Sequence, residues 1–229
     1  MPAKHAAARH AGGKARGNRA LTVVLSILAV ILAAVCVLSW LVLNDPEAGK
    51  AQLAQPSDAV AKTVLKSAVT GEECSFTPAE MSAYLQYLAE KEDGKTGSTE
   101  IEAIVLTAAP DDTADLYLPV RFHGKSLGVT MNVAPSCDEA NSRMVFRVRS
   151  MKIGRLPVNP QWALGLVKDR LPGGLSAQGD AIYRDASLLS LNAGDSSASL
   201  KITQLGMQGG LVRLKVSGKV SLSFLGDFT

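Results

Sequence analysis

The sequence LVRLKVSGKVSLSF, residues 211–224, decides the fold, because apolar and polar side chains alternate along its whole length. Such alternation predicts a half-buried antiparallel strand with one face on the core and one in water. At about 3.3 Å per residue the run would span roughly 46 Å, which is long for one strand, and Gly218 offers a place to bend. The apolar face consists of Val212, Leu214, Val216, Val220, Leu222 and Phe224.

Other strands are predicted in the middle of the chain, where the same period of two recurs or short apolar runs lie between turn residues. These segments are 115–122, 129–133, 144–153, 181–191 and 199–205. The sequence FHGK at 122–125 separates the first two as a turn, and it contains His123. We therefore expect a sheet of antiparallel strands.

The sequence FTPAEMSAYL, residues 76–85, contains agreeing signals for the start of a helix. Thr77 is a preferred N-cap residue, Pro78 suits the first helical position, and Glu80 can accept from the Thr77 amide to complete a capping box. We predict a helix from Pro78 to about Glu90 with one apolar face that must be covered. That face consists of Met81, Tyr84, Leu85 and Leu88.

Two more helices are predicted from their end signals. One covers Ser57 to Thr70 and stops at Gly71, and the other is capped by Asn159 and runs to about Arg170. Together with the strands they predict an α+β fold, in which long, curved antiparallel strands carry a few amphipathic helices on their apolar face.

The N-terminal region has the pattern of a membrane anchor. Five basic residues and no acidic residue occur in positions 1–20, and residues 21–43 carry no charge. As a helix this uncharged run spans roughly 34 Å, enough to cross a bilayer. It continues past AAVC at 33–36 to Trp40 and beyond, which disfavours a cleaved signal peptide or a lipoprotein cysteine at Cys36. The basic residues are Lys4, Arg9, Lys14, Arg16 and Arg19.

Charge asymmetry around this segment predicts its orientation. The basic residues precede the span and Asp45 and Glu47 follow it, so we expect a cytoplasmic N-terminus and an extracytoplasmic C-terminal domain. The predicted parts are a basic tail (1–20), a transmembrane helix (21–43), a linker (44–56) and the α+β domain (57–229). Beyond the tail the chain has 19 basic and 21 acidic residues, which disfavours nucleic acid as a partner.

Few residues have side chains that could form a disulfide, bind a metal or take part in catalysis. Cys74 and Cys137 could pair in an oxidising compartment, or remain as two separate thiols. His123 is the only histidine outside the tail, and its turn position favours a structural role, so no metal site, cofactor or catalytic set is expected. A local basic cluster is either the wet face of a strand or a contact for lipid headgroups or an anionic wall polymer. The cluster consists of Arg147, Arg149, Lys152 and Arg155.

Three features of the chain occur in a fixed order: the basic tail with its single span, SFTPAEMSAYL at 75–85, and MKIGRLPVNPQWALGLV at 151–167. In these features the chain resembles the YpmS-like family of bacterial membrane-anchored proteins of uncharacterised function. The resemblance implies an envelope protein with one membrane span, and it brings no catalytic or binding residues with it. The domain also looks broadly like extracytoplasmic domains in which a long helix lies on a curved sheet and an apolar groove holds lipid.

These observations predict a non-enzymatic, membrane-tethered protein that binds an apolar ligand or lipid between sheet and helices. Met81, Leu85, Leu88 and the apolar face of 211–224 would line that site. Alternatively, the apolar faces close on one another as a dry core. A second functional hypothesis is an envelope interaction module that docks a partner protein or wall polymer.

Overall fold

The computed structural model divides the chain into two compact units, Met1–Leu41 and Val42–Thr229. It describes residues 15–48, 54–91, 95–96, 99–122, 124–171, 174–186, 189–193 and 196–219. Some residues named above lie outside these ranges: Lys4, Arg9, Lys14, His123, Val220, Leu222 and Phe224.

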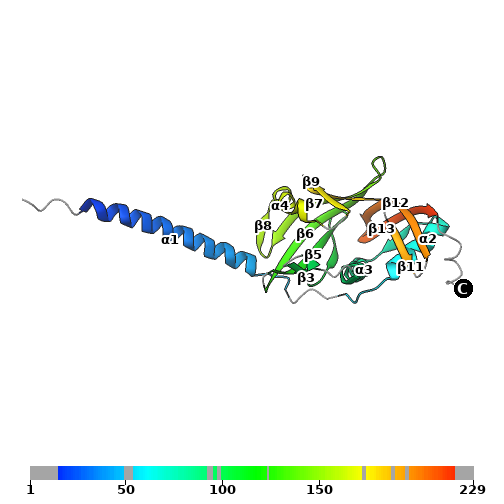
Figure 1. The fold of residues 1–229 in the computed structure, drawn as a ribbon, viewed down its shortest axis with the longest axis horizontal. Coiled ribbons are helices and arrows are strands. Elements are labelled where there is room, and N and C mark those ends of the chain that lie inside the picture. The colour runs from blue at the N-terminus through cyan, green and yellow to red at the C-terminus, as the bar shows by residue number, and fades with distance from the viewer. Residues whose placement is uncertain are drawn as a thin grey trace, which may run out of the picture. The chain divides into compact units, whose positions relative to one another are not determined.

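Helix α1 (Ala15–Leu43) contains the predicted apolar segment (Figure 1). Its residues Ser26–Leu43 are long and apolar enough to cross a membrane, with a mean hydropathy of 2.8 and no burial inside the protein. The helix begins within the predicted basic tail rather than at Leu21, since arginine and alanine are good helix formers.

The second unit contains a large antiparallel sheet of nine described strands in the order β2-β3-β5-β6-β7-β10-β9, with β4 also paired to β5 and β8 to β7. The strands are β2 (Lys95–Thr96), β3 (Thr99–Ile101), β4 (Val105–Ala109), β5 (Thr113–Phe122), β6 (Lys125–Asp138), β7 (Arg143–Ile153), β8 (Leu156–Val158), β9 (Leu175–Gln178) and β10 (Ala181–Asp185). A register shift between Asn132 and Val133 marks an irregularity where β6 pairs with β7. The α+β class is confirmed.

A smaller antiparallel sheet has the order β1-β13-β12-β11. Its strands are β1 (Cys74–Phe76), β11 (Leu189–Ala193), β12 (Ser196–Gln208) and β13 (Leu211–Lys219). The strand predicted from residue 211 is confirmed as far as Lys219. Gly218 pairs with Leu200 in regular register, and the irregularity lies instead on β12 between Ile202 and Gln204.

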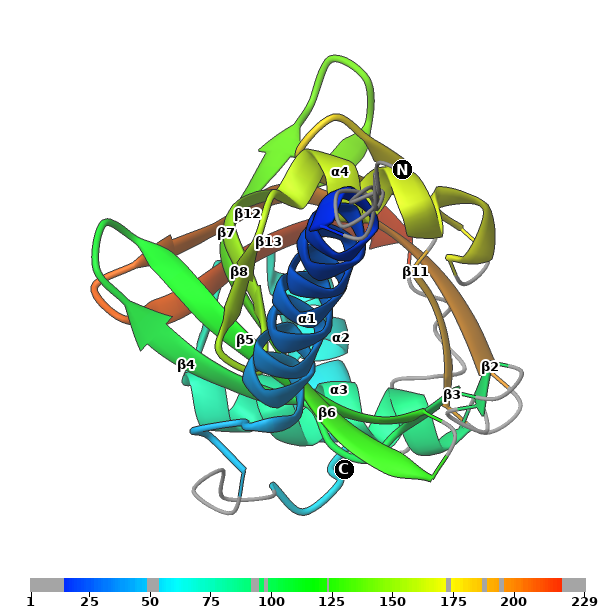
Figure 2. The same ribbon diagram turned by 90° about the vertical axis from the view of Figure 1, so that its left-hand side faces the viewer.

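The described part of this unit contains three α-helices: α2 (Ala59–Thr70), α3 (Pro78–Lys91) and α4 (Pro160–Val167). All three were predicted. Helix α2 begins two residues later than expected, and the Oγ of Ser57 accepts a hydrogen bond of 3.3 Å from the Ala59 amide. Helix α4 ends at Val167 and continues as one 3₁₀ turn, η1 (Lys168–Arg170). In Figure 2, α4 lies on one side of the domain and α2 and α3 on the other.

The capping box of α3 is formed as predicted. The Thr77 amide donates to Glu80 Oε2 at 2.7 Å, and the Glu80 amide donates to Thr77 Oγ1 at 3.2 Å. Bonds from the Thr77 amide and hydroxyl lower the pKa of the Glu80 carboxyl below its ordinary value of 4.5.

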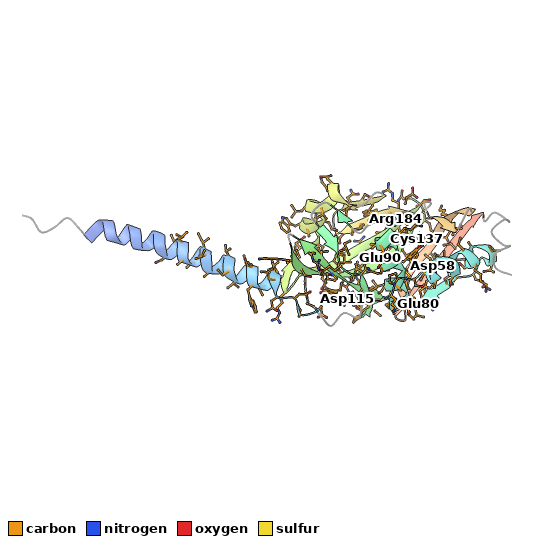
Figure 3. All side chains as sticks on the ribbon, turned by 60° about the horizontal axis from the view of Figure 1, so that its bottom comes forward. Asp58, Glu80, Glu90, Asp115, Cys137 and Arg184 are labelled. Atoms are coloured by element: carbon orange, nitrogen blue, oxygen red, sulfur yellow. The ribbon has the colours of Figure 1, made fainter. Side chains whose placement is uncertain are left out.

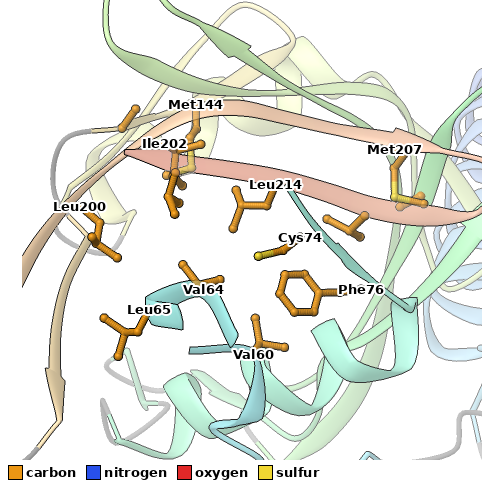
Figure 4. Packing of buried hydrophobic residues seen from close by; sticks show 14 residues of the cluster. Val60, Val64, Leu65, Cys74, Phe76, Met144, Leu200, Ile202, Met207 and Leu214 are labelled. Carbon is orange, nitrogen blue, oxygen red and sulfur yellow. The ribbon is translucent and has the colours of Figure 1, made fainter. Parts of the chain in front are cut away.

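The main hydrophobic core joins both sheets and α2 (Figure 4). Its buried residues are Val60, Val64, Leu65, Cys74, Phe76, Ala114, Met144, Ala186, Leu200, Ile202, Met207, Val212, Leu214 and Val216. A second core lies between the large sheet and α4, where Leu164 packs with Met131, Val133 and Val148. The two cores meet at Phe146, which packs against both.

We predict that Thr77→Ala lowers the free energy of unfolding by about 1 kcal/mol, because the Glu80 amide loses its capping acceptor. Urea unfolding of the full-length protein in detergent, followed by circular dichroism, measures the effect. Thr63→Ala is the control, since Thr63 is exposed inside α2 and alanine is the better helix former there. Equal stability of wild type and Thr77→Ala would contradict the role of the cap.

The capping carboxylate also predicts a pH dependence. The folded-state pKa of Glu80 is lowered, so its stabilisation is present above the unfolded-state pKa near 4.5 and is lost as pH falls through the folded value. The stability difference between wild type and Glu80→Gln should therefore shrink on acidification below that pKa. A constant difference from neutral to acidic pH would show that the charge of Glu80 has no part in the cap.

Candidate functional site

The polar groups singled out in the sequence do not assemble into a reactive centre within the described ranges. No group of three or more His, Cys, Asp or Glu side chains there is placed to hold a metal ion. The acidic segment after Pro110 forms the turn between β4 and β5, where Asp111 and Asp112 adopt positive φ angles of 59° and 52°. Asp112 Oδ1 accepts from the Gly209 amide at 3.3 Å, so this turn is held against the β12–β13 turn.

The pairing of Cys74 with Cys137 is not formed, and both thiols are free. Cys74 lies on β1 and its Sγ is 3.9 Å from the carbonyl oxygen of Thr63. Cys137 lies on β6, in the other sheet, and its Sγ is 3.6 Å from the carbonyl oxygen of Ile202. Each sulfur packs on the main core beside a different backbone carbonyl, and burial raises the pKa of Cys137.

The ligand-lining role predicted for β13 is not supported, because its apolar face is inside the main core. Val212, Leu214 and Val216 are 5%, 9% and 3% exposed. The prediction of the two faces is confirmed, since Arg213 and Ser217 on the same strand are exposed. Here the alternative of a dry core is the one that the structure shows.

Helix α3 covers the free edge of β4 with two polar side chains. The Ser82 Oγ accepts from the Leu106 amide at 2.7 Å, and the Gln86 Oε1 accepts from the Ile104 amide at 3.0 Å. Ser82 and Gln86 are one helical turn apart and therefore lie on the same side of α3. Ile104 and Leu106 are two residues apart, so their amides point to the same edge and can both reach these side chains. Strand β4 pairs with β5 on its other edge, so α3 satisfies donors that would otherwise face solvent.

The apolar face predicted for α3 is partly covered, and the most buried residue of the helix lies beside that face. Ser82 is 2% exposed and is the only fully buried residue of the helix, whereas Leu85 and Leu88 are half-buried. Met81 and Tyr84 pack against the main core as predicted. The overlooked signal was the pair Ser82 and Gln86 at helical spacing beside the apolar stripe.

The inner face of the large sheet, defined as the face that carries Leu116, Met131 and Val148, is apolar and only partly closed. Directly opposite residues share a face, so Leu116 on β5, Met131 on β6 and Met151 on β7 form one row across the sheet. The half-buried apolar side chains of this face that pack on the second core are Leu116, Leu118, Val129, Phe146, Met151, Ala177 and Ile182.

Arg184 stands on this inner face. It lies opposite Met144 of β7, which lies opposite Cys137 of β6, and both of these residues pack in or against the main core. Figure 3 shows Arg184 and Cys137 in the same region of the domain. Arg184 is half-buried, and among the described residues no carboxylate forms an ion pair with it.

The positive charge of Arg184 affects the pKa of Tyr84 on α3. Burial raises the pKa of Tyr84, and the positive charge of Arg184 opposes part of that rise. Sequence reasoning missed this arginine, because its face depends on strand register rather than on its own segment.

The predicted basic cluster is exposed, as expected for the wet side of a strand. Arg147, Arg149, Lys152 and Arg155 are all exposed. Arg147 approaches Asp180 at 3.9 Å, Arg149 lies at the register shift between β6 and β7, and Arg155 is in the turn before β8. These residues are spread along β7 and its turn.

Asp45, the second residue of the predicted linker, packs against the large sheet. Asp45 accepts a hydrogen bond from the hydroxyl of Tyr117 on β5. Its carboxylate also lies against Gly128 of β6, where any β-carbon would collide with it. Burial and the charge of Asp45 raise the pKa of Tyr117. A glycine inside a strand, which signals a close approach of other groups, was the available clue.

One described hollow lies between α2 and α3. It has a volume of about 90 Å³ and is lined by residues that include Val60, Thr63 and Phe76. Small-molecule sites usually enclose roughly 300–1,000 Å³, so this hollow is too small for a lipid chain.

No family model, no curated protein and no solved structure matches this chain. The resemblance to the YpmS-like family therefore stays a prediction.

We predict that Ser82→Ala exposes the edge of β4, because the Leu106 amide loses its acceptor at a cost of about 1–3 kcal/mol. Hydrogen exchange followed by mass spectrometry should show faster exchange in peptides that contain residues 104–106. Ser75→Ala is the matched control, since Ser75 is exposed on β1. Unchanged exchange in the Ser82 variant would mean that α3 is held by its apolar contacts alone.

Proposed function

We propose that this protein is a membrane-anchored, non-catalytic domain that binds an amphiphile with an acyl chain and an anionic oxygen head on the inner face of its large sheet. The observation that carries the proposal is Arg184, a guanidinium on an apolar face of the sheet that forms no ion pair with a carboxylate within the described residues.

The anionic head follows from the chemistry of arginine. A guanidinium stays charged in proteins and prefers planar carboxylate or phosphate oxygens, which it can contact with two parallel hydrogen bonds. A charge on an apolar, half-buried surface is costly without a counter-ion. A carboxylate or phosphate head would supply that counter-ion.

The acyl chain follows from the row of half-buried apolar residues beside Arg184. Ile182 is two residues before it on the same face, and Phe146 lies opposite Ile182. Leu116 and Leu118 continue the apolar surface across β5. Covering such a surface contributes about 0.8 kcal/mol per buried CH₂, so a chain can bind here without further polar groups.

Membrane anchoring is the second part of the proposal. The span Ser26–Leu43 supports it, and the basic residues that precede the span favour a cytoplasmic N-terminus and an extracytoplasmic domain. In this reading the protein acts at the outer side of a bacterial cell membrane and handles amphiphiles of the envelope.

A second candidate function is an interaction module that uses the exposed basic residues of β7. Arg147 and Arg149 are exposed on the strand and could meet an acidic partner protein or an anionic wall polymer. This candidate predicts that charge on β7, rather than on β10, controls binding.

The test uses the full-length protein in lipid nanodiscs and a photoactivatable fatty acid with a clickable tail. Labelled peptides are mapped by mass spectrometry, and only those within residues 105–186 are scored, so labelling of α1 does not contribute. An unlabelled fatty acid should compete with the probe, whereas the alcohol of equal chain length should compete less, because it lacks the anionic head.

We predict that Arg184→Gln reduces labelling within residues 105–186 by about tenfold, the scale expected for a lost charge-assisted hydrogen bond. Arg184→Lys should keep part of the labelling, since it retains the charge. Arg147→Gln is the matched control, because Arg147 is an exposed arginine of the paired strand β7, and it should label like wild type. Loss with Arg147→Gln and no loss with Arg184→Gln would favour the interaction module.

A further inference from the structure

Helix α4 exposes an apolar surface that the domain itself does not cover. Trp162 and Leu166 are each 62% exposed and Val167 is 42% exposed. Beyond α1, the described residues include only one other large hydrophobic side chain exposed to this degree, Val69 at 49%. Ala163 and Leu164 on the other side of α4 are buried, so this short helix is apolar on both sides.

The N-terminal cap of α4 and the packing of Leu164 determine which side chains of the helix are exposed. Asn159 Oδ1 accepts from the Trp162 amide at 3.1 Å, and Pro160 occupies the first turn. Leu164 anchors the helix in the second core. Trp162 and Leu166 are one turn apart and therefore lie on one side of the helix, away from the sheet.

A series of contacts within the second unit connects α4 to the point where the chain leaves α1. Asp45 docks on Tyr117 and Gly128. The carbonyl oxygen of Gly128 accepts from the Gly154 amide at 2.7 Å, so the turn between β7 and β8 is adjacent. Strand β8 follows that turn and leads directly into α4.

Only a few residues separate the end of the candidate span from Asp45, and the turn before β8 from α4. Asp45 is two residues after Leu43, the last residue of the candidate span, and two residues reach at most about 7 Å. The three residues of β8 add roughly 10 Å between the turn and the start of α4. The headgroup layer is itself roughly 5–8 Å thick on each side of the bilayer. Helix α4 is thus within reach of the lipid interface.

The residues around the exposed surface suit an anionic lipid interface. Arg155 in the turn, Lys152 on β7 and Lys168 after α4 are exposed, and Asp169 is an exposed acid beside them. Tryptophan favours the headgroup level of a bilayer, and exposed basic residues are attracted to anionic lipids.

We propose that the exposed surface of α4, formed by Trp162, Leu166 and Val167, docks on the headgroup layer of the bilayer that holds α1. In such a contact a helix lies in the interface and places its apolar side chains at the boundary between headgroups and acyl chains. This inference rests on the membrane anchoring in the proposed function and is independent of amphiphile binding at Arg184.

The sequence contains two tryptophans, Trp40 and Trp162, so each part can be tested separately by fluorescence. Full-length Trp40→Phe and Trp162→Phe variants are reconstituted into vesicles of phosphatidylcholine and phosphatidylglycerol that contain lipids with a quencher near the headgroup. Trp162→Phe leaves Trp40 as a reporter of anchoring, and Trp40→Phe leaves Trp162 as a reporter of docking.

We expect Trp162 emission to be blue-shifted and quenched about twofold or more in these vesicles, as for a side chain buried roughly 5–10 Å into the interface. Adding Leu166→Asp should abolish this quenching, since it places a charge on the docking surface. Val69→Asp is the matched control, because Val69 is an exposed apolar residue of α2, and it should leave the quenching unchanged.

Each other outcome overturns the inference. Quenching of Trp40 without quenching of Trp162 would refute docking while anchoring stands. Absence of quenching at both tryptophans would refute anchoring, and docking with it. Quenching of Trp162 that persists with Leu166→Asp would show that α4 does not use this surface. Labelling by the fatty acid probe reports on Arg184 separately in every case.

Discussion

The strands from β5 to β10 turn apolar side chains to one face of the large sheet, and the need to cover that face governs the rest of the domain. Helix α4 covers one region through Leu164, and the main core with β12 and β13 covers another. Between them, residues such as Leu116, Phe146 and Ile182 stay half-buried. Arg184 lies among them, so the part of the face that the protein leaves partly open is also the part that carries a charge.

Local sequence patterns predicted the secondary structure well, because they report local physical preferences. The capping box at Thr77 and Glu80 specified the start of α3, and Asn159 specified the start of α4. The period of two assigned the faces of β13 correctly. What the period could not reveal is what lies against each face, and so a strand of the dry core was interpreted as a ligand-lining strand.

The features missed in the sequence all depend on residues that are far apart in the chain. The inward position of Arg184 follows from the register of three strands, and the docking of Asp45 joins it to Tyr117 across 72 positions. The bonds from Ser82 and Gln86 require β4 to be an edge that ends beside α3. Periodicity within one segment contains no information on such pairings, and only the glycine at position 128 hinted at a close approach.

Helix α3 covers the edge of β4, and this affects whether two copies of the protein can pair through that edge. An open strand edge presents unpaired backbone groups, with which a strand of another copy can pair. The Leu106 amide of β4 and the amide of Ile104, just before the strand, are already bonded to side chains of α3. An incoming strand would have to displace a capped helix before it could pair. These two amides are therefore not available to a strand of a second copy, and pairing at this edge would first require α3 to move away.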